Sequence, residues 1–155
     1  MVQKIKSKTK KEHSHYSFAE MAVINKGKNS FLELVLKIVN WKKIEEILSG
    51  QVKSSNIGAS SYSNLFLFKI VLLQSWYGLS DPVMEEQLND RISFIRFLGI
   101  SLDSPTPDHS TISRYRTFLM SNKIYEVLFS EINTQLQNSN LMVKNGVIVD
   151  ASVIQ

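Results

Sequence analysis

Apolar residues recur every three or four positions along several stretches of this chain, which is the spacing of an amphipathic helix. The first stretch opens at Ser30 and is followed three residues later by Glu33, a pairing typical of a helix start. A second helix is expected between Asn40, which can cap it, and Gly50, which can end it. Residues 51–61 are rich in Ser, Asn and Gly and predict a linker or a long loop.

The most densely apolar stretch covers residues 62–77, and its length favours a buried helix over a strand. Gly78 predicts the end of that helix. Asp81 is followed by a proline, which suits the start of the next helix because proline loses no hydrogen bond at the first helical position. Residues 92–98 predict a further helix that ends at Gly99.

A loop is expected over residues 101–107, which contain two prolines. Asp108 then offers a side chain that can cap a new helix. Three apolar residues of this helix are available for packing: Ile112, Tyr115 and Leu119. Its exposed positions are expected to carry His109, Ser110, Thr111, Ser113, Arg114 and Arg116. One more amphipathic helix follows over residues 124–136.

The character of the sequence changes after residue 140. Asn145 and Gly146 form a turn signal, and the three β-branched residues 147–149 predict a strand. Asp150 interrupts this apolar run. A carboxylate there is costly to bury unless something compensates it, and Mg²⁺ is one such partner. The other interpretation is an aspartate that caps a turn just past the strand, and one carboxylate does not decide between the two.

Composition sets wider limits. The chain has 155 residues, which fits one domain or one domain plus part of a second. Its 43% hydrophobic and 21% charged residues are typical of a globular protein with a sizeable core. Cysteine is absent, which excludes disulfides, thiolate zinc sites and cysteine nucleophiles. No apolar run can span a membrane and no apolar signal core follows the basic start, so a cytoplasmic protein without a membrane partner is expected.

The charge distribution points towards a polyanion. The formal net charge is +4, and all four arginines lie in one stretch: Arg91, Arg96, Arg114 and Arg116. A capped helix after a proline-containing loop, with small hydroxyl residues and arginines, is what an element entering the major groove of DNA needs. The alternative is a surface helix with ordinary charges. Residues 1–17 are lysine-rich and predict a basic, disordered tail, either solvated or touching DNA phosphates.

Four segments in this order resemble the N-terminal part of insertion-sequence-five type DDE transposases. They are LLQSWYGLSD at 72–81, EEQLNDRISFIRFLG at 85–99, PDHSTISRYR at 107–116 and GVIVDAS at 146–152. The resemblance covers roughly residues 62–155. A weaker similarity extends it towards the N-terminus, to about residue 18. It implies a mainly α fold, with a helical, DNA-binding N-terminal domain over residues 18–140. Residues 141–155 would then start a truncated RNase H-like catalytic domain with its first β-strand.

By the same resemblance, Asp150 matches the first acid of the DDE triad and is the expected catalytic and metal-binding residue. In the family the acids hold two Mg²⁺ ions, which activate water or a 3′-hydroxyl for attack on a phosphodiester. The second aspartate and the glutamate are expected beyond Gln155. The resemblance therefore implies a truncated transposase that binds transposon-end DNA, that does not cut it alone, and that holds Mg²⁺ only weakly.

Two other hypotheses remain open. The chain could be a stand-alone DNA-binding regulator that inhibits the full-length transposase, either as a homo-oligomer or together with that enzyme. It could instead be the unstable product of a decaying gene, in which the strand at 147–149 would be an unpaired edge prone to aggregation.

Overall fold

The computed structural model describes residues 30–51, 62–144 and 147–150, and residues 141–144 and 147–150 are described by their backbone alone. The predicted tail 1–17 lies outside the described residues, as does nearly all of the predicted linker 51–61. The elements in chain order are α2 (Ser30–Ile38), α3 (Trp41–Gln51), α4 (Asn64–Tyr77), α5 (Asp81–Asp90), α6 (Ile92–Leu98), α7 (His109–Ser121), α8 (Ile124–Asn138), β1 (Leu141–Lys144) and β2 (Val147–Asp150). The fold is mainly α, as predicted.

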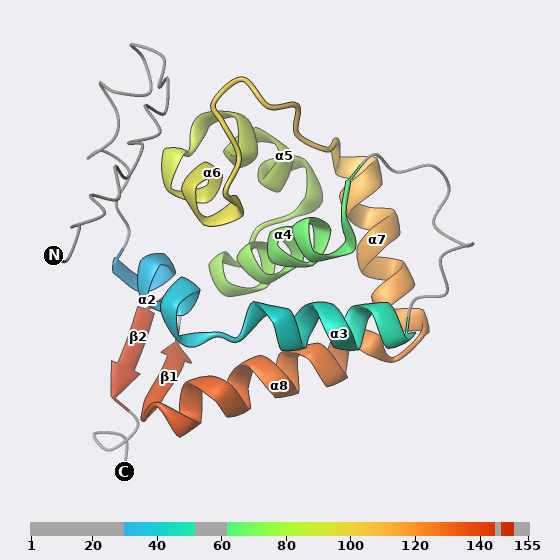
Figure 1. Cartoon of the computed structure of the whole chain (residues 1–155). Coiled ribbons are helices and arrows are strands. Elements are labelled where there is room, and N and C mark those ends of the chain that lie inside the picture. The colour runs from blue at the N-terminus through green and yellow to red at the C-terminus, as the bar shows by residue number, and fades with distance from the viewer. Residues whose placement is uncertain (1–29, 52–61, 145–146, 151–155) are drawn as a thin grey trace, which may run out of the picture.

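Helix α4 lies at the centre of the helical domain and contacts α3, α6 and α7 (Figure 1). Its buried apolar residues occupy nearly every side of the helix: Leu67, Phe68, Ile70, Val71, Leu72 and Leu73. A helix that is apolar all round is stable only when other elements surround it. The prediction of a buried helix over this stretch is confirmed.

Most helix boundaries follow local signals that the sequence carries. The side chains of Asn40, Ser63 and Asp108 each accept a hydrogen bond from the backbone N–H three residues later, at 3.1, 3.2 and 2.8 Å. Gly78 and Gly99 end α4 and α6 in the left-handed conformation, with φ of 62° and 68°. The predicted end at Gly50 is wrong by one residue, because α3 continues to Gln51.

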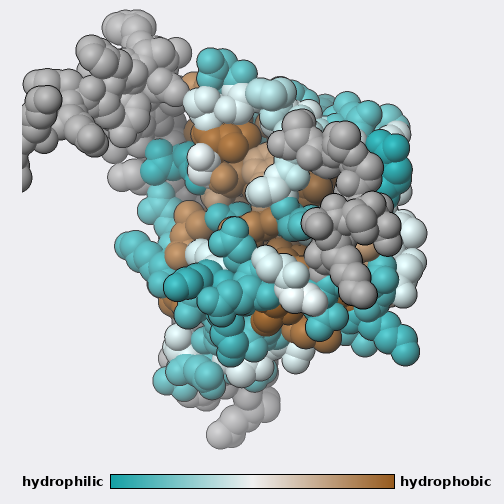
Figure 2. Space-filling view, turned by 45° about the vertical axis from the view of Figure 1, so that its right-hand side comes forward, coloured by the Kyte–Doolittle hydropathy of each residue, from teal (hydrophilic) through white to brown (hydrophobic). Residues whose placement is uncertain are grey.

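Not every apolar residue at helical spacing in the predicted helices is buried. Leu34 is 37% exposed and Val127 is 49% exposed, whereas Leu32 is buried. Figure 2 shows one face of the molecule, where hydrophilic side chains surround apolar ones that reach the surface. None of the described helices combines the length and the apolar character that crossing a bilayer requires.

The two strands pair antiparallel, with Leu141 opposite Asp150 and Lys144 opposite Val147. β2 covers the three β-branched residues for which a strand is predicted, and its partner β1 is not among the predicted elements. The assignment of β2 to an RNase H-like domain stays a prediction.

Candidate nucleic-acid interface

Helix α7 is the element on which most of the predicted DNA-binding residues lie. It packs against α4, α5 and α8 and runs along one side of the helical domain (Figure 1). Its inner face buries Ile112, Tyr115 and Leu119. The hydroxyl of Tyr115 also donates a hydrogen bond of 2.9 Å to the carbonyl oxygen of Asn64, at the start of α4. The inner face of α7 is therefore fixed by both packing and a partly buried hydrogen bond.

The opposite face of α7 consists of exposed residues at helical spacing: Ser110, Arg114, Thr117 and Ser121. The predicted residues divide into two groups. His109, Ser110 and Arg114 are exposed, as expected, but Thr111, Ser113 and Arg116 are partly buried. The expectation that all six point outward is thus met by three.

Arg116 turns towards α5 and binds the carboxylate of Asp81 with two hydrogen bonds. Nη1 lies 2.5 Å from Oδ1 and Nη2 lies 2.8 Å from Oδ2. The amide of Gln74, a residue that is only 4% exposed, donates a further hydrogen bond of 2.5 Å to the same Oδ1. Burial alone raises the pKa of Asp81, but the hydrogen bonds from Arg116 and Gln74 outweigh it and leave that pKa below its ordinary value.

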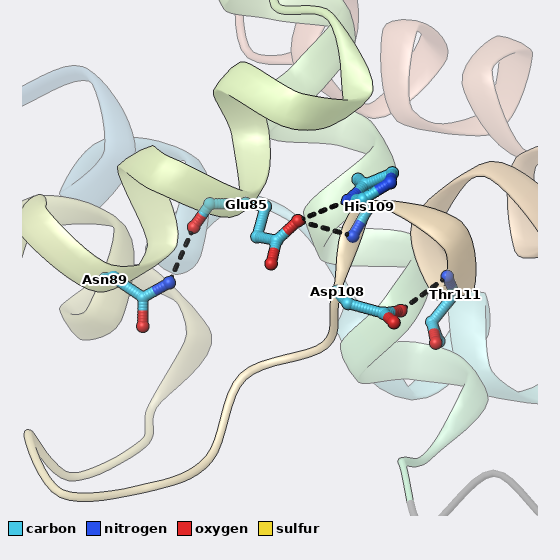
Figure 3. Close-up of polar contacts among 5 residues, drawn as sticks. All are labelled: Glu85, Asn89, Asp108, His109 and Thr111. Carbon is cyan, nitrogen blue, oxygen red and sulfur yellow. Dashed lines mark hydrogen bonds and ion pairs between the residues drawn. The ribbon is translucent and has the colours of Figure 1, made fainter.

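The N-terminus of α7 is bound by two carboxylates (Figure 3). Asp108 accepts from the backbone N–H of Thr111, and the hydrogen bonds from the side chain and the backbone of Thr111 lower the pKa of Asp108. Glu85 of α5 accepts from the backbone N–H of His109 at 2.9 Å, and its Oε2 lies 2.6 Å from Nδ1 of the same residue. The hydrogen bond with the His109 side chain is the main cause of a lowered pKa of Glu85. Asn89 donates to the carbonyl oxygen of Glu85 at 2.8 Å.

The two other predicted arginines have partners away from α7. The guanidinium of Arg91 lies over the rings of Tyr77 and Phe94, at 4.6 and 4.4 Å from their centroids. Arg96 forms an ion pair of 3.2 Å with Glu33 of α2. The arginines that are close in sequence therefore serve separate contacts, and α7 carries only Arg114 and Arg116 of the four.

The structure describes Asp150 only as the last backbone position of β2, so its predicted catalytic and metal-binding role lies outside the described side chains. Among the described residues, no group of three or more His, Cys, Asp or Glu side chains is placed to hold a metal ion. The donor set for Mg²⁺ is therefore not assembled in this part of the chain, and the Mg²⁺ prediction stays a prediction.

Sequence reasoning missed several residues around α7. Thr117 and Ser121 continue the helical spacing of Ser110 and Arg114, so the period of the helix could have identified them. Asp81 and Glu85 contact α7 from α5, 24 or more residues away along the chain, and Gln74 of α4 binds Asp81 from its other side. No local pattern identifies such partners.

A family model described as a transposase domain (DUF772) matches residues 20–118, which include α2 to α6 and most of α7. No solved structure matches the chain.

Proposed function

The chain belongs to the transposase domain family, and from this membership we propose that it binds transposon-end DNA through the exposed face of α7. The observation that carries the proposal is the position of Arg114. Its side chain is exposed on the face opposite the core, where Nε donates a hydrogen bond of 3.3 Å to the carbonyl oxygen of Ser110 on its own helix. Among the described residues it makes no salt bridge and no stacking contact with an aromatic ring.

The neighbours of Arg114 suit close contact with a duplex. Ser110, Thr117 and Ser121 are small and can donate hydrogen bonds to phosphate oxygens or base edges. An α-helix fits the width of the major groove, and a guanidinium can bind a phosphate or two acceptors of guanine. Since positive charge at the surface is attracted to the phosphate backbone, Arg114 would supply affinity, and specificity if it reaches a base.

The carboxylates at the start of α7 define how the helix would approach DNA. A free helix N-terminus binds phosphate through its unpaired N–H groups. In α7 the N–H groups of His109 and Thr111 are already bound by Glu85 and Asp108. Two negative charges at the tip also repel phosphate. We therefore expect contact along the side of α7, around Arg114, and not at its N-terminal end.

The finer assignment, to insertion-sequence-five type DDE transposases, belongs to the same proposal. It is supported by the four segments that resemble that family, with Asp150 in the position of the first acid. Two-metal phosphoryl transfer needs several carboxylates that converge on the ions. The resemblance identifies only the first acid of the triad within these 155 residues. A polypeptide of these residues is therefore expected to bind DNA without cutting it. A strand-cleavage assay with Mg²⁺ on a transposon-end duplex tests this, and cleavage would contradict it.

The DNA-binding proposal is tested by a mobility-shift titration with the transposon-end duplex at several salt concentrations. Arg114→Ala is expected to weaken binding and to reduce the slope of log K against log salt by about one. Lys42→Ala is the matched control, because it removes the same charge from an exposed position of α3. If Arg114→Ala binds as tightly as the wild type, or no more weakly than Lys42→Ala, this face of α7 is not the interface.

A further inference from the structure

We propose that Arg116 is a positioning residue, which together with Asp81 and Gln74 fixes the rotation of α7 so that Arg114 faces the DNA. This inference rests on the proposed DNA-binding function of α7. It separates two arginines that lie two positions apart in the sequence and that composition alone would assign to the same task.

Helical geometry places the two arginines on different sides of α7. With 3.6 residues per turn, each residue is rotated by about 100° from the one before, so positions two apart differ by about 200°. Arg114 lies on the exposed face, and Arg116 points towards α5. Both guanidiniums cannot enter one groove from the same helix without a change in the rotation of α7.

The contact of Arg116 with Asp81 restricts the orientation of the Arg116 side chain. Both terminal nitrogens bind the two carboxylate oxygens of Asp81, and this bidentate arrangement restricts direction as well as distance. The side chain of Arg116 is 32% exposed and that of Asp81 is 17% exposed, so water competes for the pair only in part. Asp81 is also the first residue of α5, where a negative charge is favoured by the helix dipole.

Gln74 holds the other side of the carboxylate. It comes from α4, so residues of three helices meet at Asp81. Gln74 is the one polar residue that is buried among the described residues, and its Oε1 atom has no hydrogen-bond partner there. Burying an amide with an unsatisfied oxygen is unfavourable, so the hydrogen bond that its nitrogen donates to Asp81 has to offset that cost. We infer that Gln74 holds the carboxylate in the orientation that receives Arg116.

Direct DNA contact by Arg116 would break this arrangement. The guanidinium would leave two charge-assisted hydrogen bonds, and Asp81 would remain partly buried with an unpaired negative charge close to the DNA. The two roles therefore predict opposite effects for Asp81→Asn. If Arg116 contacts DNA, this variant frees the guanidinium, removes a negative charge and strengthens binding. If Arg116 positions α7, the same variant weakens binding although the protein becomes more positive.

The experiment measures affinity for the transposon-end duplex as a function of salt. Asp81→Asn is expected to weaken binding by about threefold or more. This factor is near the lower end of the interaction energies between residues that share one hydrogen-bond network. Glu86→Gln is the matched control, since it removes the same charge from an exposed position on the same helix. That control is expected to bind as tightly as the wild type or more tightly. Circular dichroism at the temperature of the assay verifies that each variant is folded.

A second variant covers the possibility that Asp81→Asn does not fold. Arg116→Lys keeps the positive charge but lacks the planar fork that binds both carboxylate oxygens. We expect it to weaken binding by a similar factor with an unchanged salt slope. Binding of either variant at the wild-type level or above overturns the positioning role, while the result for Arg114→Ala decides the proposed function separately. If the wild-type chain does not bind DNA, both proposals fail.

Discussion

Asp108 caps the first turn of α7, and its replacement tests how that helix is held. The carboxylate accepts a hydrogen bond of 2.8 Å from the N–H of Thr111. Loss of such a cap costs about 1 kcal/mol, within a range of about 0.5–2 kcal/mol. Since Glu85 still binds the N–H of His109, the helix end keeps one carboxylate, and we expect a value of about 1 kcal/mol for Asp108→Ala. That corresponds to a decrease in Tm of about 2–4 °C for a chain of this size.

Asp108→Asn separates the hydrogen bond from the charge. Asparagine caps helices about as well as aspartate, so the free energy of unfolding is expected to change by less than about 0.5 kcal/mol. Urea titrations monitored by circular dichroism measure the free energy of unfolding of both variants. Glu46→Ala is the control for loss of a negative charge at an exposed helical position. If Asp108→Asn is destabilised as much as Asp108→Ala, the cap hydrogen bond does not stabilise α7 and the reasoning fails.

Three further predictions concern α7 and the helices around it. Tyr115→Phe keeps the buried ring but loses the hydrogen bond to Asn64, so urea titration should show a loss of about 1 kcal/mol, and an unchanged value would contradict the role of that bond. Gly78→Ala forces an alanine into a φ of 62°, with an expected loss of about 1 kcal/mol, whereas Gly50→Ala, inside α3, should leave the melting temperature equal or higher. Because the pKa of Asp81 is lowered by folding, its contribution to stability is present above its ordinary pKa and is lost as the pH falls through the folded value; urea midpoints of the wild type and Asp81→Asn should therefore converge on acidification.

Helix starts and ends could be predicted from the sequence because their causes are local. Asn40 and Asp108 act on backbone groups three residues away, and Gly78 and Gly99 act through their own φ angles. The buried helix α4 could also be predicted from the sequence, because a stretch of this length and apolar content is not expected at the surface. These features can be predicted without knowing which elements pack together.

The contacts of the candidate site could not be predicted, because they depend on packing between helices. Arg116 and Asp81 are 35 residues apart, and His109 and Glu85 are 24 residues apart. Helical periodicity can indicate that Arg116 is not on the same side as Arg114, but it does not identify the carboxylate on α5 that it meets. The exposed Val127 shows the same limit, since an apolar residue at helical spacing can still face solvent.

The basic composition has a different meaning once the arginines have partners. A net charge of +4 suggests a polyanion, and four arginines within 26 positions suggest where it binds. Yet Arg91 stacks on aromatic rings, while Arg96 and Arg116 are paired with carboxylates that cancel their charge locally. A guanidinium that is already paired adds little to the field felt by DNA, because the field at a distance depends on the sum of neighbouring charges. Arg114 makes no salt bridge among the described residues, so the attraction that α7 would offer to phosphate depends on it more than on Arg116, whose charge Asp81 offsets locally.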